Sequence, residues 1–478
     1  MKKSFYLTAT LPYVNADPHM GHALEFVQSD AVARYQRLIG RDVFFSTGTD
    51  EHGQKVFESA QSAGEKDTKI YADKYSLRFK ELLKVLNISV DNFIRTTDPL
   101  HKKAAEEIWR RCDKAGDIYK KKYKGKYCVG CESFKRDTDL DEKGRCLLHL
   151  NLEIKVLEEE NYFFRFSKYQ DKLFDYLSHP GVILPEWRRG EAVKFVEGGL
   201  EDFSISREKE RLSWGVPVPG DDSQVMYVWF DALTNYISTL GWPNESGNFK
   251  KFWVDGEVVQ TAGKDQVRFQ SLMWQAMLMS AGVKNTDKVV YHGFITSGGG
   301  KMSKSLGNVI NPIDLVNEYG KDAVRYFLLR HVNSFEDTDV TPEGIKEAYN
   351  ANLANGLGNL VSRILTLSEK YLEKTPEIPE KSELKEYFEL LETFDVKKAA
   401  DYVWEKIHNL DQKIQKTEPF KVVKKDEKKG KEIITEITQE LYVIARMLNP
   451  LLPDTSEKIK KLIRENKKPE KPLFPRKD

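Results

Sequence analysis

The sequence predicts an α/β protein in which an open parallel sheet, interrupted by a small metal-type insert, precedes a bundle of helices. Two runs rich in aromatic and β-branched residues, 4–11 and 42–46, flank a helical apolar pattern over 21–37. A strand, a helix and a second strand joined by short connections form a parallel pair. Three cysteines cluster within 128–149, and from about Ile345 the apolar residues keep a helical spacing.

Length and composition limit the kind of molecule. A chain of 478 residues is too long for one core, and 40% hydrophobic with 31% charged residues suit several soluble domains. The first residues, MKKSFYLTATLPYV, hold no sustained apolar run, so neither a signal peptide nor a membrane span is expected. Four cysteines without a secretory signal favour metal binding in a reducing compartment, and we expect a cytoplasmic protein.

The net charge of +1 conceals a basic C-terminal end. Residues 421–478 hold 16 Lys and Arg against 10 Asp and Glu. A basic region of this kind suits a polyanionic partner. A lysine-rich solvated helix face has the same composition, so both interpretations stay open.

Further elements follow from local patterns along the chain. Helices are expected at 68–85 and 99–115, and strands with their loops at 195–205, 225–230, 258–262 and 288–296. The sheet domain is therefore expected to resume after the cysteine-containing insert.

The stretch PHMGH places two histidines, His19 and His22, at the end of the first strand-to-helix loop and the start of its helix. Ligands of open α/β sheets bind beyond the carboxyl ends of the strands, and a helix N-terminus attracts phosphate. Gly21 between them allows a flat group to approach the backbone. A pair of ordinary polar helix-start residues is the competing interpretation.

A second unusual stretch, TSGGGKMSKSLGN, spans 296–308. Three glycines make the segment flexible, and Lys301 and Lys304 follow them. Lysine is a mobile point charge on a long stem, which suits negative charge moving onto a leaving pyrophosphate. A surface loop with two lysines is the plainer alternative, although a glycine-rich run directly before KMSKS is much less common.

The cysteine cluster has the spacing of a zinc site. Its pattern is Cys-x2-Cys-x14-Cys-x2-His, which makes Cys128, Cys131, Cys146 and His149 the expected ligands. Four protein ligands close a tetrahedral site, so the predicted Zn²⁺ is structural and stabilises an insert too small for its own core. The fourth cysteine, Cys112, lies in a helical stretch and is expected to be a packed core residue.

Together the two signature stretches identify a family. His19-Met20-Gly21-His22 resembles the H-x-G-H signature of class I aminoacyl-tRNA synthetases, and the segment from Lys301 to Ser305 resembles their K-M-S-K-S signature. Other stretches resemble the methionyl-tRNA synthetases of that class: LPYVNADPHMGH, FSTGTDEHG, NYFF, GLEDFSISR, WGVPVPGD, YVWFDALTNYIS, AGKD, LGNVINPIDL and PLFPR. The resemblance implies a Rossmann-like catalytic domain that activates methionine with ATP and Mg²⁺ and transfers it to tRNA(Met).

The resemblance also implies roles for individual residues. His19 and His22 would stabilise phosphate, Lys301 and Lys304 the departing pyrophosphate, Gly21 the adenine, and Gly263 and Asp265 the ribose of ATP. The methionine-binding residues would be Leu11, Tyr13, Asp50, Arg207, Trp229, Ala232, Tyr236 and Gln270. From the residues alone, Asp50 fits a helix N-cap equally well, and Trp229 and Tyr236 fit a hydrophobic core.

One position departs from the family pattern. The family usually has Phe-His where this chain has Phe269-Gln270, and that histidine lines the methionine pocket. A glutamine side chain keeps donor and acceptor capacity but cannot become charged.

The resemblance implies a division of the chain and a partner for each part. The expected domains are a catalytic domain over 1–117 and 193–305, a connective insert over 118–192 with a knuckle at about 126–150, a linker that contacts the tRNA stem over 306–345, and a helical anticodon-binding bundle over 346–478. Around one bundle helix the family commonly has Asn and Pro-Trp, where this chain has Asp411 and Pro419-Phe420. No appended dimerisation domain follows PLFPR, so a monomer is expected.

Two alternative functions stay open at this point. A class I synthetase for another small apolar amino acid would share both signatures, although the branched-chain enzymes carry an editing insert for which this length leaves no space. A small-molecule adenylyltransferase would also carry H-x-G-H and a KMSKS-like loop, but it needs neither the zinc insert nor a long bundle.

Overall fold

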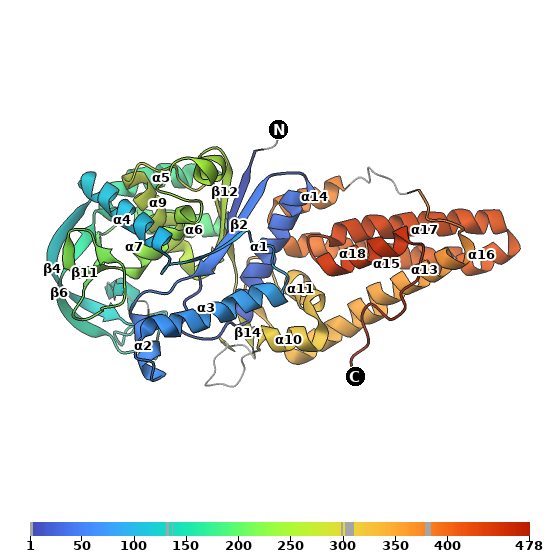
Figure 1. Ribbon diagram of the computed structural model, residues 1–478, viewed down its shortest axis with the longest axis horizontal. Coiled ribbons are helices and arrows are strands. Elements are labelled where there is room, and N and C mark those ends of the chain that lie inside the picture. The colour runs from blue at the N-terminus through green and yellow to red at the C-terminus, as the bar shows by residue number, and fades with distance from the viewer. Residues whose placement is uncertain (1–2, 131–132, 136, 298–299, 302–309, 378–383) are drawn as a thin grey trace. The chain divides into compact units, whose positions relative to one another are not determined.

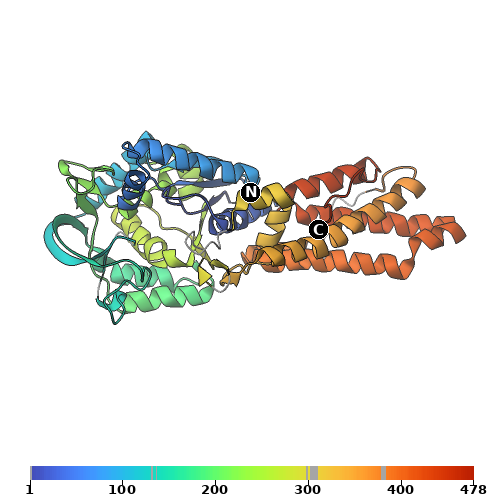
Figure 2. The same cartoon turned by 90° about the horizontal axis from the view of Figure 1, so that it is seen from below.

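The protein is described by a computed structural model that covers residues 3–130, 133–135, 137–297, 300–301, 310–377 and 384–478 (Figures 1 and 2). Two compact units divide the chain, and three separate segments build each of them. Unit 1 comprises Met1–Pro18, Arg41–Glu81 and Val90–Tyr291, and unit 2 comprises His19–Gly40, Leu82–Ser89 and His292–Asp478.

A six-stranded sheet forms the centre of unit 1. Its order is β3 (Asn92–Arg95), β2 (Val43–Thr49), β1 (Phe5–Thr8), β12 (Glu257–Gly263), β13 (Lys288–His292) and β7 (Ile183–Leu184). Strand β1 pairs in parallel with both β2 and β12, β2 in parallel with β3, and β13 in parallel with β7. The strand order reverses between β1 and β12, and ligands of such sheets bind beyond the strand ends at that point. The predicted parallel α/β sheet is confirmed.

One continuous hydrophobic core supports this sheet in unit 1. Three tryptophans, Trp242, Trp253 and Trp274, are fully buried in it, and Tyr6 of β1 donates from its hydroxyl to the backbone oxygen of Tyr236 at 2.7 Å. The last turn of α3 (Thr68–Val85) belongs to unit 2. The other helices of unit 1 are α2 (Gln54–Ser62), α4 (Pro99–Lys114), α5 (Gln170–Ser178), α6 (Glu186–Glu197), α7 (Val228–Ala232), α8 (Asn235–Ser238) and α9 (Trp274–Ser280).

The insert of unit 1 is built on a long antiparallel hairpin. Strand β4 (Ile118–Cys128) pairs with β6 (Lys155–Phe164), and β5 (Ser133–Lys135) and β8 (Phe203–Ser204) extend this sheet on its two sides. A second antiparallel sheet contains β10 (Pro217–Val218), β11 (Asp221–Met226) and β9 (Ser206–Glu208). Figure 1 shows the curved β4–β6 hairpin at one end of this unit.

Unit 2 is mainly helical. It contains α1 (Met20–Leu38), α10 (Pro312–Tyr319), α11 (Lys321–Arg330), α12 (Pro342–Ala348), α13 (Asn359–Tyr371), α14 (Lys385–Glu392), α15 (Val396–Thr417), α16 (Pro419–Lys425), α17 (Glu427–Leu448) and α18 (Pro453–Arg464), with a small sheet of β14 (Ile295–Ser297), β15 (Gly300–Lys301) and β16 (Thr338–Asp339). Helices α15, α17 and α18 run side by side as a bundle (Figures 1 and 2). The helical region predicted from about Ile345 is confirmed, and no helix among the described residues has the length and apolar character to cross a membrane.

Three expected strands differ from the observed elements. Residues 195–197 complete helix α6, and only Phe203–Ser204 of the expected 195–205 strand is extended. The expected 225–230 strand ends at Met226, because α7 begins at Val228. The expected 288–296 strand divides into β13 and β14 around Gly293, whose Cβ position is filled by the backbone of Glu336. Short apolar runs of buried helix and buried strand have the same appearance in a sequence, which explains the first two errors.

Candidate active site and metal centre

The H-x-G-H stretch forms the first turn of helix α1 in unit 2. His19 is the N-cap residue, and its Nδ1 accepts from the backbone N–H of Gly21 at 3.1 Å. In return, the Nδ1 of His22 accepts from the backbone N–H of His19 at 3.2 Å. The two rings stack with centroids 3.8 Å apart. Because each Nδ1 is an acceptor, the proton of each neutral ring lies on Nε2, and both rings keep an N–H donor at a helix N-terminus.

His22 is neutral at physiological pH. Burial lowers the pKa of its imidazole well below the ordinary value, and the neighbouring His19 and His292 lower it further. His292 itself lies 3.1 Å from a carboxylate oxygen of Glu25. An added Cβ at Gly21 would lie 3.0 Å from the His19 ring, so a larger residue there would disturb the stacked pair.

The KMSKS segment falls largely outside the described residues. The backbone of Lys301 belongs to β15 and pairs with Thr296 of β14. Lys304 lies beyond the part of the chain that the structure describes, and the roles of both lysines stay predictions.

Residues that follow three neighbouring strands of unit 1 gather at one edge of the sheet. Tyr13, beyond β1, forms a bridge with Asp50, beyond β2, and the backbone N–H of Asp50 donates to the oxygen of Pro12 at 2.9 Å. Strand β12 ends at Gly263, and Asp265 follows it as an exposed residue of a short 3-10 helix, Lys264–Gln266. The structure thus places Tyr13 and Asp50, predicted for methionine, and Gly263 and Asp265, predicted for ribose, after the strands that surround the switch point.

Asp50 is not a helix cap. The nearest helix, α2, has Gly53 as its N-cap and takes no cap from a side chain. The Asp50 side chain is buried, with 3% of its surface exposed. A buried carboxylate at a ligand-binding edge suits an ammonium group, so the interpretation as a binding residue is favoured over the cap.

An aromatic wall stands beside Asp50 in the same unit. Trp229 stacks on Phe269 with ring centroids 4.0 Å apart, and Tyr13 meets Trp229 edge to face with ring centroids 6.0 Å apart. Of the other predicted pocket residues, Leu11 is half-buried and Ala232, Tyr236 and Gln270 are buried. Sequence reasoning missed Phe269 as a wall residue, although its place directly before Gln270 was a usable signal.

Arg207 has a different environment from the one expected for a carboxylate-binding residue. Its guanidinium donates to the hydroxyl of Ser204 at 2.9 Å and to the backbone oxygen of Ser206 at 2.7 Å. It also lies over the ring of Tyr227 at 4.7 Å. These contacts explain its burial, and its role toward substrate stays a prediction.

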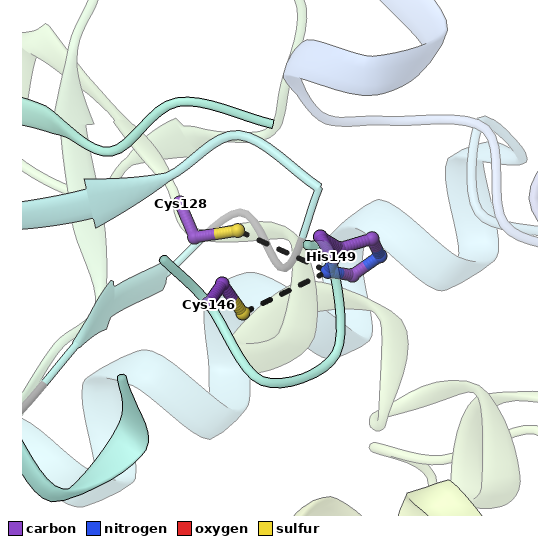
Figure 3. A group of neighbouring side chains, drawn as sticks. All are labelled: Cys128, Cys146 and His149. Carbon is purple, nitrogen blue, oxygen red and sulfur yellow. Dashed lines mark hydrogen bonds between the residues drawn. The ribbon is translucent and has the colours of Figure 1, made fainter. Parts of the chain in front are cut away.

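Three of the four predicted zinc ligands lie together at the end of the β4–β6 hairpin (Figure 3). The Nδ1 of His149 is 3.8 Å from the sulfur of Cys128 and 4.0 Å from that of Cys146. A tetrahedral Zn²⁺ with bonds of about 2.3 Å to sulfur and 2.0 Å to nitrogen would place its ligand atoms roughly 3.5 Å apart. The fourth predicted ligand, Cys131, lies outside the described residues.

Gly130 packs closely against the ligand His149. A Cβ at Gly130 would lie 2.6 Å from the His149 ring, so only glycine leaves the imidazole in its place. Both sulfurs are buried, and His149 is half-buried. Two thiols and an imidazole match the donor set of a structural zinc site, and Gly130 leaves room for the imidazole.

Two buried polar clusters beside Asp50 were not predicted. His52 and His101 both contact the carboxylate of Asp231, and Arg95 donates twice to the carboxylate of Glu51. The partners come from segments far apart in the chain. The histidine in GTDEHG, two residues after Asp50, was the one signal in the sequence that could have indicated the first cluster.

Comparisons with known proteins identify the family. The model of the family described as tRNA synthetases class I (M) matches residues 5–149 and 142–365. The fold and the signature turn thus define a class I tRNA synthetase. The methionine–tRNA ligases of Fusobacterium nucleatum and Thermotoga maritima are both 41% identical to this chain, over 96% and 98% of it and 74% and 76% of their own lengths. The chain belongs to the methionine–tRNA ligase family.

Solved structures give the same result. A structure of Mycobacterium tuberculosis methionyl-tRNA synthetase in complex with methionyl-adenylate matches with a TM-score of 0.90 and 38% identity, over 96% of this chain and 94% of that one. The apo form from the same organism matches with a TM-score of 0.84 and 33% identity, over 100% of this chain and 98% of that one. The predicted family and fold class are therefore confirmed.

Proposed function

We propose that this chain is an ATP-dependent methionine–tRNA ligase whose strand-end cluster in unit 1 binds methionine and whose first turn of α1 stabilises phosphate. The reaction joins the methionine carboxylate to the α-phosphate of ATP, releases pyrophosphate, and then esterifies the 3′ adenosine of tRNA(Met) with release of AMP. The observation that carries the proposal is the stacked pair His19 and His22, whose Nδ1 atoms both accept backbone N–H groups. This arrangement presents two fixed Nε2–H donors, as phosphate stabilisation requires.

Methionine binding uses the edge formed by Tyr13, Asp50 and Trp229. The Asp50 carboxylate pairs with the substrate ammonium group, since a buried anion there gains a charge-assisted hydrogen bond. The stacked Trp229 and Phe269 rings give a polarizable wall for the thioether. The remaining pocket residues are Leu11, Arg207, Ala232, Tyr236 and Gln270.

Activation requires positioning and charge stabilisation, with no covalent nucleophile on the protein. The Nε2–H groups of His19 and His22 donate to the α-phosphate region as negative charge builds up. Lys301 and Lys304 neutralise the departing pyrophosphate. Gly21 contacts the adenine, and Gly263 and Asp265 contact the ribose. Mg²⁺ bound with ATP supplies charge neutralisation at the phosphates.

One Zn²⁺ held by Cys128, Cys131, Cys146 and His149 stiffens the tip of the insert. With four protein ligands the site is closed, so its contribution is to folding.

The helical bundle of unit 2 recognises the anticodon of tRNA(Met). Phe420, in the first turn of α16, is 43% exposed and offers an aromatic face to an unstacked base. Asp411 forms an ion pair with Arg363, which neutralises an anion that would otherwise repel RNA.

ATP–pyrophosphate exchange tests the activation site. His22→Ala is expected to reduce methionine-dependent exchange by about 10²–10³-fold, because one preorganised donor is lost, while methionine still binds. The matched control is His179→Ala, since His179 is an exposed histidine on the surface of unit 1. Wild-type exchange in His22→Ala would contradict the assignment.

Substrate choice separates the alternatives. Exchange driven by methionine, and not by leucine, valine, isoleucine or cysteine, is expected for this family. Charging of purified tRNA(Met) then excludes a small-molecule adenylyltransferase, which would form an adenylate without an ester to tRNA.

A further inference from the structure

A buried carboxylate in unit 1 binds two histidines at once. One oxygen of Asp231 lies 2.6 Å from the Nδ1 of His52, and the other lies 2.8 Å from the Nε2 of His101. The exposed fractions of these side chains are 2% or less. The Nδ1 of His101 continues the chain to the hydroxyl of Ser238 at 3.0 Å. We call these four side chains the Asp231 network.

The hydrogen bonds define which ring nitrogen must donate. A carboxylate accepts only, so His52 donates from Nδ1 and His101 donates from Nε2. Burial alone would raise the pKa of the Asp231 carboxyl, but the two histidines hold that pKa at about 2. Asp231 is therefore an anion at neutral pH.

The network joins the two sides of the proposed methionine pocket. His52 lies two residues after Asp50, the ammonium partner, in the loop that follows β2. Asp231 lies in α7 between Trp229 and Ala232, which line the thioether side. His101 belongs to the first turn of α4 and is not among the residues proposed to line the pocket.

Other contacts hold the His52 loop against β3 and against Trp214. Both oxygens of Glu51 accept from Arg95, at 2.6 and 2.8 Å, and its backbone oxygen accepts from the indole of Trp214 at 2.5 Å. The backbone N–H of Gly53 donates to the Trp214 oxygen at 3.4 Å. These bonds hold the loop, whereas the His52–Asp231 bond connects the loop to α7.

We infer that the Asp231 network sets the distance between the ammonium and thioether subsites and so makes His52 and His101 positioning residues for methionine. The inference rests on the proposed function, because it needs Asp50 and Trp229 to contact the substrate. Neither histidine touches the reacting atoms. Their loss is expected to weaken methionine binding in the ground state and transition state alike, since uniform binding energy is lost.

Substitution of each histidine by asparagine or glutamine separates a hydrogen-bonding role from a packing role. The amide nitrogen of asparagine takes the place of Nδ1, and that of glutamine the place of Nε2. At position 52, His52→Asn should retain the methionine KM within about 3-fold, and His52→Gln should raise it about 10-fold or more. At position 101 the order reverses: His101→Gln should keep the methionine KM within about 3-fold of wild type, and His101→Asn should raise it. The kcat of exchange and the KM for ATP should stay within about 3-fold in all four.

The opposite preference of the two positions is the decisive readout. Equal damage by Asn and Gln at both positions, or a fall in kcat with unchanged methionine KM, would overturn the inference. If the position 52 variants fail to fold, Ser238→Ala takes their place, and a methionine KM unchanged by loss of that hydroxyl would also overturn it.

A separate variant distinguishes an error in the proposed methionine site from an error in the Asp231 network inference. Asp50→Asn removes the proposed ammonium partner directly and should raise the methionine KM whatever the histidines do. If Asp50→Asn leaves that KM unchanged, the proposed function of the site is wrong. If Asp50→Asn raises it and the four histidine variants do not follow the Asn/Gln order, only the network inference fails.

Discussion

The carboxylate of Asp30 in α1 lies 2.7 Å from the guanidinium of Arg325 in α11, and neither side chain is exposed to solvent. Arg325 also donates to the backbone oxygens of Leu86, Pro450 and Leu451. One buried arginine thus connects the other two segments of unit 2 to the helix whose first turn carries the signature histidines.

Breaking this buried pair should cost much more stability than breaking a surface pair. Asp30→Asn leaves the Arg325 charge buried without its partner, and a loss of about 3–5 kcal/mol in unfolding free energy is expected. Lys385 and Glu389 in α14 provide the control, because they form an exposed ion pair at 3.8 Å. Lys385→Gln should change stability by less than about 1 kcal/mol. Denaturant unfolding measures both free-energy changes. Equal unfolding midpoints for Asp30→Asn and wild type would contradict the loss expected for the buried pair.

The contribution of Asp30 should depend on pH in a defined direction. Burial would raise the pKa of its carboxyl, but Arg325, Arg34 and the bonds from Ser89 together lower that pKa below the ordinary value. A carboxyl with a depressed pKa stabilises the folded state above its unfolded pKa of about 3.9 and loses this contribution as pH falls further. The stability difference between wild type and Asp30→Asn should therefore be constant from pH 7 to 5 and shrink below pH about 4. Unfolding midpoints of both proteins across this range provide the measurement, and a difference that grows on acidification would contradict the pKa direction.

Zinc retention should depend on Gly130. Gly130→Ala places a methyl group 2.6 Å from the His149 ring, which must move away from the two sulfurs. The expected result is less bound zinc per chain after dialysis against a weak chelator, together with a lower unfolding temperature. Gly190 in α6 is the matched control, since a Cβ there meets no atom within 4 Å. Gly190→Ala should keep wild-type zinc content, and equal zinc in both variants would argue against the site.

Exposed Phe420 should affect tRNA charging without affecting methionine activation. Phe420→Ala removes a stacking surface, and base–aromatic stacking contributes about 1–3 kcal/mol per base. The KM for tRNA(Met) should therefore rise at least about 5-fold, while pyrophosphate exchange keeps its wild-type rate. Phe174 in α5 is a phenylalanine of nearly equal exposure, 42% against 43%, and serves as the control. A wild-type tRNA KM in Phe420→Ala would remove this residue from the anticodon-binding surface.

Local sequence patterns indicated only part of the site. The zinc ligands follow from the spacing within each Cys-x2 pair, whereas the histidine turn and Asp50 had two open interpretations until the family resemblance favoured a binding role. The parallel sheet also followed from local patterns, because β1, α1 and β2 are consecutive. The domain boundaries, the monomeric state and the role of Lys304 stay predictions.

The Asp231 network shows where local patterns stop being informative. His52 and His101 are 179 and 130 residues from the carboxylate they share, and no periodicity connects such positions. The strand predicted over the apolar run at 225–230 was wrong for a related reason. Its residues are buried whether they form strand or helix, and the surrounding fold determines that α7 begins there.

The division of each unit into three segments affects when each unit can fold during synthesis. Helix α1 leaves the ribosome early, yet it belongs to unit 2, most of which lies after His292. Its Tyr35 donates to Glu392, a residue 357 positions later in the chain. A nascent chain therefore carries this helix for most of translation before Arg325, the partner of Asp30, has been made. Exposed apolar and unpaired surface on growing chains attracts chaperones, so biosynthesis of this enzyme should be more sensitive to their loss than refolding of the finished chain.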